Sequence, residues 1–294
     1  MRRLNDAMRE RFGKKLYRLS LSVADTCPNR DGTKGTRGCI FCSEGGSGEF
    51  ASPAFRPVSE QIEEAKEKVR SKLGSGPHGY IAYFQSYTGT YVPYERMRKC
   101  FHEAITADGV EVLSVATRPD CLPDETVYLL KELSNIKPVW VELGLQTVHE
   151  RTADYIRRGY PLPVYDDAVR RLKAAGLEVI VHVILGLPGE SAEDMEETVR
   201  YVASSGADGI KLQLLHVLEG TDLAEEWRAG RVPVMSLPEY AELLVRLLKL
   251  LPDHVVVHRM TGDGPKRLLL APLWSADKKR VLNYVNRVIL EAGL

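Results

Sequence analysis

The chain has 294 residues, of which 44% are hydrophobic and 27% are charged, and its 40 basic and 40 acidic residues cancel. This composition predicts one globular body, and the balanced charge means that no overall field demands a nucleic-acid partner. No apolar run approaches the roughly 20 residues that span a bilayer, and the first residues lack the apolar stretch of a secretory signal, so we expect no membrane partner and a cytoplasmic location.

Predicted strands and helices alternate along most of the chain. Continuous apolar runs, many of them β-branched, predict buried strands at residues 16–23, 80–84, 110–117, 139–145, 178–185, 210–216 and 255–257. Amphipathic stretches predict helices at residues 60–73, 94–107, 123–134, 165–175, 192–204 and 238–251. One helix between two strands is typical of parallel pairing through right-handed crossovers.

Seven strands precede the C-terminal tail, and residues 268–270 are the candidate for an eighth. We therefore expect an α/β fold, a partial (β/α)6 barrel of parallel strands with N- and C-terminal extensions, rather than a closed eight-stranded barrel. The expected divisions are a basic N-terminal extension at 1–15, the barrel at 16–258 and a C-terminal extension at 259–294. The N-terminal extension could touch phosphates or be an idle, solvated arm.

Three of the five cysteines, Cys27, Cys39 and Cys42, lie in one loop after the first predicted strand. The glycines and polar residues between them predict neither helix nor strand, so a bound metal centre would have to order this loop. A closed zinc site needs four N or S ligands, whereas an iron–sulfur cluster on three cysteines keeps one iron open for an outside ligand. A zinc site completed by Cys100, Cys121 or a histidine remains an alternative, as does a disulfide.

The loop sequence at residues 27–42, C-P-N-R-D-G-T-K-G-T-R-G-C-I-F-C, resembles the cluster loop of radical S-adenosylmethionine (SAM) enzymes. Eleven residues separate Cys27 from Cys39, which is longer than the compact gap most common in that superfamily. The long spacing matches a subgroup with an expanded loop, similar to the radical domain of elongator-type tRNA-modifying enzymes. The resemblance runs over about residues 14–260. It implies a [4Fe-4S] cluster on the three cysteines and SAM on its open iron.

Ligands of parallel α/β folds bind at the carboxyl ends of the strands, and the resemblance implies SAM contacts there. The residues that follow the second strand would hold the methionine amino group, and the G-L-P-G segment after the fifth strand resembles an adenine-binding segment. The expected cofactor-binding residues are Phe41, Gln85, Tyr87, Thr88, Glu142, Gln146, Arg158, His182, Leu185, Leu215 and His216.

Two of these positions have competing interpretations from the residues themselves. Glu142 lies inside an apolar strand, where a charge is costly unless it is paired. It is either a cofactor contact, which we favour, or part of a buried ion pair. His182 could touch substrate or be a hydrogen-bonded core histidine. The E-x-G-x-Q-T pattern of residues 142–147 resembles the elongator-type enzymes and implies that Arg158 pairs with the cofactor carboxylate, while Tyr160 stands where those enzymes often have histidine.

The C-terminal tail mixes basic and aromatic residues, which together can hold a flipped base and its phosphates. A charge run on a final helix is also typical of a plain solvated face. The residues concerned are Arg259, Lys266, Arg267, Trp274, Lys278, Lys279 and Arg280.

The resemblance implies a radical SAM enzyme that modifies the C5 side chain of wobble uridine in tRNA, from the carboxymethylaminomethyl to the aminomethyl form. Its expected partners are the tRNA and an external electron donor such as flavodoxin or ferredoxin. Radical chemistry on a small metabolite or peptide is the alternative within the enzyme class. An iron–sulfur protein that carries electrons or senses, without catalysis, is the alternative from another class.

Overall fold

An eight-stranded parallel sheet forms the frame of the structure, a computed structural model that describes residues 1–262 and 264–294. Neighbouring strands follow the order β1-β9-β7-β6-β5-β4-β3-β2, and every pair is parallel. The strands are β1 (Arg2–Arg3), β2 (Lys15–Leu21), β3 (His78–Phe84), β4 (Val110–Thr117), β5 (Val139–Gln146), β6 (Glu178–Leu185), β7 (Gly209–Leu214) and β9 (Val256–Arg259). The sheet curls into a half-barrel, so the predicted partial barrel is confirmed.

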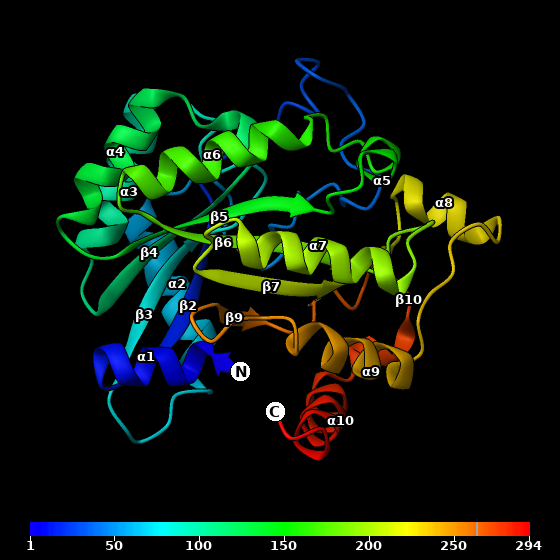
Figure 1. Cartoon of the computed structure of the whole chain (residues 1–294). Helices are drawn as coiled ribbons and strands as arrows, with labels where there is room; N and C mark the ends of the chain where they lie inside the picture. The colour runs from blue at the N-terminus through cyan, green and yellow to red at the C-terminus, as the bar shows by residue number, and fades with distance from the viewer. Residues whose placement is uncertain (263) are drawn as a thin grey trace.

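Helices cover the outer face of this sheet, and their apolar sides pack with strand residues in one large core. Figure 1 shows α7 running across β6 and β7, with α3 and α4 at the far end of the sheet. Ser191 and Ser236 cap the starts of α7 and α9 through capping boxes. These helices are α2 (Val58–Arg70), α3 (Tyr94–Thr106), α4 (Asp124–Ser134), α6 (Leu162–Ala174), α7 (Ala192–Ser204) and α9 (Leu237–Leu248).

The N-terminal segment packs into the barrel instead of extending from it. β1 pairs with β9, and α1 (Leu4–Phe12) buries Ala7 and Met8 in a cluster with Trp140 inside the curl. Its cations are used within the protein, because Arg11 and Lys14 form ion pairs at 2.7 and 2.6 Å with glutamates of the sheet. The segment therefore closes the amino end of the barrel.

The C-terminal part differs from the expected eighth strand. β10 (Leu269–Ala271) pairs antiparallel with β8 (Val217–Leu218) in a separate two-stranded sheet, and β1 takes the eighth place in the barrel. Two short helices, α5 (Glu150–Tyr155) and α8 (Asp222–Arg228), lie in loops, and α10 (Lys278–Glu291) ends the chain. Among the described residues, no helix is long and apolar enough to cross a membrane.

Candidate functional site

The three loop cysteines follow β2 at the carboxyl edge of the sheet, and the thiols of Cys39 and Cys42 lie close enough to Cys27 for its charge to act on both. Backbone hydrogen bonds fold the loop: the amide of Arg30 donates to the Cys27 carbonyl at 2.8 Å, and that of Cys42 donates to the Cys39 carbonyl at 3.0 Å. The loop thus gathers its thiols without helix or strand, as the sequence predicts.

Asn29 ties the loop to the segment after α5. Its amide nitrogen donates to the Arg157 carbonyl at 2.6 Å and lies 3.4 Å from the Cys39 sulfur. A Cβ on Gly159 would stand 2.8 Å from the Asn29 side-chain oxygen, so only glycine allows this approach. Arg157 itself has a φ of +59°, a rare conformation for a residue with a side chain. Asn29 therefore links Cys39 to the segment that follows α5.

Helix α8 holds the same loop from the other side. The amide of Leu223 donates to the Ile40 carbonyl at 2.9 Å. Asp222 pairs with Arg37 at 2.6 Å and also with Arg157. These contacts join segments that are far apart in the sequence, so the loop is fixed by tertiary structure.

Two arginines place positive charge beside the thiols. Arg30 donates to the carbonyls of Cys42 and Ser43 at 2.9 and 2.6 Å, and its buried Nε has no hydrogen-bond partner among the described residues. Arg118 forms a double hydrogen bond to Asp120, at 2.8 Å each, and its charge acts on Cys39. Three thiols flanked by cations, with an unused buried donor, fit an anionic iron–sulfur cluster.

Burial dominates the protonation of these thiols in the protein alone. It raises the pKa of Cys39, and with the neighbouring Cys39 thiol it raises the pKa of Cys42 to about 12, against the lowering effect of Arg30. Among the described residues, no three His, Cys, Asp or Glu side chains converge on one point as ligands of a single metal ion. A zinc site with Cys100 or Cys121 is therefore not preformed.

The residues after β3 turn toward the cysteine loop. Tyr87 has a φ of +52°, and its hydroxyl donates to the Glu44 carbonyl at 2.6 Å while Arg30 lies 5.8 Å from its ring centre. Gln85 is half-buried beside it, and Thr88 is buried. The predicted polar patch thus lies beside the cysteines, and its contacts with SAM remain a prediction.

Gln146 ends β5, and Arg158, which follows α5, contacts the same turn. Gln146 is half-buried with a φ of +66°, a strained backbone of the kind that clusters at functional sites. Arg158 is 2% exposed and donates to the carbonyls of Thr147 and Tyr160 at 2.7 and 2.9 Å. Its guanidinium also pairs with Glu150. Arg158 therefore stabilises this turn through its guanidinium. Its donors contact groups of the protein, and its pairing with the cofactor carboxylate remains a prediction.

Glu142 corrects our favoured interpretation, because the structure shows the buried ion pair and not an accessible cofactor contact. Its side chain is fully buried, and its oxygens accept from Ser114 at 2.7 Å, from His182 at 2.6 Å and from Lys211. Burial opposes the charge, but Lys211 and His182 outweigh it and hold the pKa of Glu142 well below its usual range. The sequence analysis did not identify Lys211 as the partner of Glu142. A lysine within an apolar strand, like the glutamate, is the signal that could have found it.

His182 faces the inside of the barrel as a neutral ring. Its Nε2 bonds to Glu142, and its Nδ1 lies 3.2 Å from the amide nitrogen of Gln213. Burial and the charge of Lys211 lower the pKa of His182 to about 4. Nδ1 thus accepts from the Gln213 amide, and a contact of the ring with cofactor or substrate remains a prediction.

The structure at the ends of β6 and β7 does not place Leu185 with the other expected apolar contacts. The Leu185 side chain is fully buried in the core between sheet and helices, because alternate strand residues point to opposite faces. Its neighbour Ile184 instead packs with Leu215 and the half-buried Phe41 beside the cysteine loop. His216 follows, with its Nε2 3.1 Å from the Ser275 hydroxyl. Phe41 and Leu215 thus share one apolar cluster, which does not include Leu185, and His216 follows Leu215 in the chain.

Comparison with known proteins agrees with this geometry. Residues 23–202 match the Radical SAM superfamily, and residues 207–290 match the Radical_SAM C-terminal domain. The uncharacterized protein YtqA of Bacillus subtilis (strain 168) is 42% identical over 290 residues, which cover 99% of this chain and 89% of that protein. Protein YhcC of Escherichia coli (strain K12) is 35% identical over 285 residues, 97% of this chain and 90% of that protein.

Elongator proteins are more distant relatives. Elongator complex protein 3 of Homo sapiens is 29% identical over 161 residues, which cover 53% of this chain and 29% of that protein. The solved structure of archaeal Methanocaldococcus infernus Elp3, lacking its N-terminus, matches in fold with a TM-score of 0.68 at 22% identity, over 81% of this chain and 60% of that chain. With the match over residues 23–202 and the three-thiol loop, the chain belongs to the radical SAM superfamily and is a radical SAM enzyme, whose cofactors are a [4Fe-4S] cluster and SAM.

Proposed function

We propose that the enzyme modifies wobble uridine in tRNA, converting a 5-carboxymethylaminomethyl side chain to the aminomethyl form. The observation that carries this proposal is the expanded cysteine loop, whose C-P-N-R-D-G start and long spacing resemble a radical SAM subgroup that is similar in turn to the elongator-type radical domain. The partial similarity to Elongator complex protein 3 supports it. A cytoplasmic location is part of the proposal, because thiolate-held clusters need a reducing compartment.

When bound, the cluster and SAM supply a 5′-deoxyadenosyl radical, for which the superfamily needs an external electron donor. The chain's own contribution is placement. Cys27, Cys39 and Cys42 would hold the cluster, while Asn29 and α8 fix the loop that carries them. Gln85, Tyr87 and Gln146 would orient SAM, and the apolar group around Ile184 would exclude water.

The first experiment tests the cysteine assignment. The protein is reconstituted anaerobically with iron and sulfide and given dithionite and SAM, and 5′-deoxyadenosine is measured by chromatography. We expect Cys39→Ala to lose both the cluster and the product. A full four-iron cluster in that variant would contradict the assignment.

The second experiment tests the substrate. The reconstituted enzyme is incubated with tRNA that carries carboxymethylaminomethyluridine, and the digested nucleosides are analysed by mass spectrometry. We expect the aminomethyl nucleoside to appear only with SAM and reductant. Formation of 5′-deoxyadenosine with unchanged tRNA would favour the alternative of a small metabolite or peptide substrate.

A further inference from the structure

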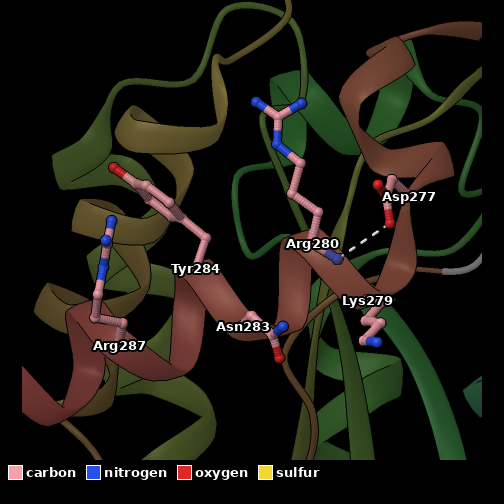
Figure 2. Close-up of a pocket in the computed structure, with 6 residues that line it drawn as sticks. All are labelled: Asp277, Lys279, Arg280, Asn283, Tyr284 and Arg287. Carbon is pink, nitrogen blue, oxygen red and sulfur yellow. Dashed lines mark hydrogen bonds between the residues drawn. The ribbon is translucent and has the colours of Figure 1, made fainter.

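The C-terminal helix carries two adjoining hollows lined by five cations and, among the described residues, one carboxylate. The first, of about 520 Å³, is lined by Asp277, Lys279, Arg280, Asn283, Tyr284 and Arg287, as Figure 2 shows. The second, of about 580 Å³, shares three of these residues and adds Lys266, Leu273, Trp274, Ala276 and Lys278. We call Lys266, Trp274, Lys279, Arg280, Tyr284 and Arg287 the α10 basic surface.

Most cations of this surface have no ion-pair partner among the residues that the structure describes. Asp277 is used as the cap of α10, because its carboxylate accepts from the Arg280 amide at 3.1 Å. Within residues 1–262 and 264–294, the side chains of Lys266, Lys279 and Arg280 form no ion pair. Arg287 has one long contact, 3.8 Å, with Glu291.

Two arginines on other exposed helices, in contrast, each have close carboxylate partners. Arg228 meets Glu219 and Glu225 at 2.6 Å each. Arg246 lies 2.6 Å from Glu196. Because clustered like charges repel one another, an unneutralised group on a chain of zero net charge is suited to an external anion.

Two guanidinium groups and a phenol ring point the same way from α10. Arg280, Tyr284 and Arg287 are spaced four and three residues apart, which places them on one side of a helix, and Figure 2 shows their side chains extending in the same direction. The Arg287 guanidinium carbon lies 5.0 Å from the Tyr284 ring centre. The helix beneath them is fixed, because Val281, Val285 and Ile289 are buried in the core.

The surface begins next to the open end of the barrel. Ser275, two residues before the α10 cap, contacts His216 just after β7. Trp274 is anchored by its ring nitrogen, which donates to the Met235 carbonyl at 2.9 Å. A polymer held along α10 would therefore pass the carboxyl ends of the strands, where the cofactors are expected.

We propose that the α10 basic surface binds the phosphate backbone of an RNA substrate while the nucleotide to be modified enters the barrel. Guanidinium groups bind phosphate oxygens with paired donors, and the accessible part of a half-buried tyrosine or tryptophan, such as Tyr284 or Trp274, can contact an unpaired base. This inference rests on the proposed function, since it assigns the place where that substrate is held.

The test compares tRNA binding by the cluster-loaded protein and by Arg280→Ala/Arg287→Ala over a range of salt concentrations. We expect the Kd of the variant to rise roughly tenfold near physiological salt, and the slope of log K against log salt to shrink by about one for each lost phosphate contact. Arg98→Ala/Lys99→Ala is the matched control, because it removes two exposed cations from α3 on the outer face. It should bind like the wild type.

Iron content and thermal unfolding show whether the variants are folded. Arg280→Lys/Arg287→Lys keeps the charge but not the paired donors, so it should recover part of the affinity. Equal tRNA binding by wild type and the alanine variant would overturn the assignment of the α10 basic surface to RNA binding. It would leave the proposed tRNA reaction intact. A wild-type protein that binds anionic vesicles through these arginines but not tRNA would overturn both.

Discussion

At the residue scale, the ion pair between Glu142 and Lys211 dominates the inside of the barrel. The two side chains are 0% and 1% exposed, and Tyr83 adds its hydroxyl 3.2 Å from the lysine nitrogen. Removing one member of such a pair leaves an uncompensated charge away from water. Replacing both members removes that penalty.

We therefore expect Lys211→Met to lower the free energy of unfolding by about 3–5 kcal/mol, measured by urea denaturation. The double variant Lys211→Met/Glu142→Gln should be clearly more stable than this single variant, because no charge is left unpaired. A single variant as stable as the wild type would show that Glu142 does not depend on Lys211.

His182 gives a prediction about pH. Its pKa is lowered to about 4 in the folded protein, against an ordinary value of about 6.5. The unfolded chain therefore binds a proton first as the pH falls, and the folded state loses stability between about pH 6.5 and 4. The full loss is about 3 kcal/mol.

Urea unfolding of the wild type and of His182→Gln at several pH values measures this loss. The wild type should lose about 3 kcal/mol more than the variant over that window, since acidic groups common to both cancel in the difference. Parallel pH profiles would mean that His182 is protonated equally easily in both states.

At the element scale, the turn at Gly46 connects the cysteine loop to the end of β3. Its φ is +57°, and its carbonyl accepts from the Tyr87 amide at 2.7 Å. A Cβ at this position would stand 2.2 Å from the Tyr87 ring. The ring can therefore lie over the loop only because residue 46 is glycine.

We expect Gly46→Ala to displace Tyr87 and to lower 5′-deoxyadenosine formation at least tenfold, with the secondary structure unchanged by circular dichroism. Gly74→Ala is the control, because a Cβ on Gly74 meets nothing within 4 Å. Full activity of Gly46→Ala would argue that Tyr87 has no part in SAM placement.

The sequence predicts best those strands and helices whose hydrophobic pattern is unambiguous. The strands at 110–117 and 178–185 and the helix at 192–204 have the predicted bounds. Helices α5 and α8 were missed, because six or seven residues are too few for a helical period to stand out in a polar loop.

For the candidate site, the sequence indicates which cysteines share a loop but not which face of a strand each side chain lies on. The cysteines stand together in the loop, whereas the Leu185 side chain lies on the opposite face of β6 from the site, one residue from Ile184. A continuous apolar strand is buried on both faces, so its sequence does not mark which side is inside. Asn29 and Asp222 act through partners more than 100 and 60 residues away, which no local pattern reveals.

At the scale of the whole molecule, the half-barrel depends on its first residues. Ala7 and Met8 close the amino end over Trp140, and β1 completes the sheet against β9. We expect a variant lacking residues 1–12 to unfold at a markedly lower temperature and to bind an apolar dye, because this closure is lost. Unchanged thermal unfolding would show that the barrel is stable without it.

The pairing of β1 with β9 brings the first residues of the chain beside its last helix. The Arg3 guanidinium donates to the Asn286 side chain at 3.1 Å, and Figure 1 shows the marks for the two ends close together. A short glycine-rich linker could join these ends, with new termini opened in the exposed turn near Gly74. Such a circular permutant would keep every strand in its place, and would show whether the order of synthesis matters to the fold.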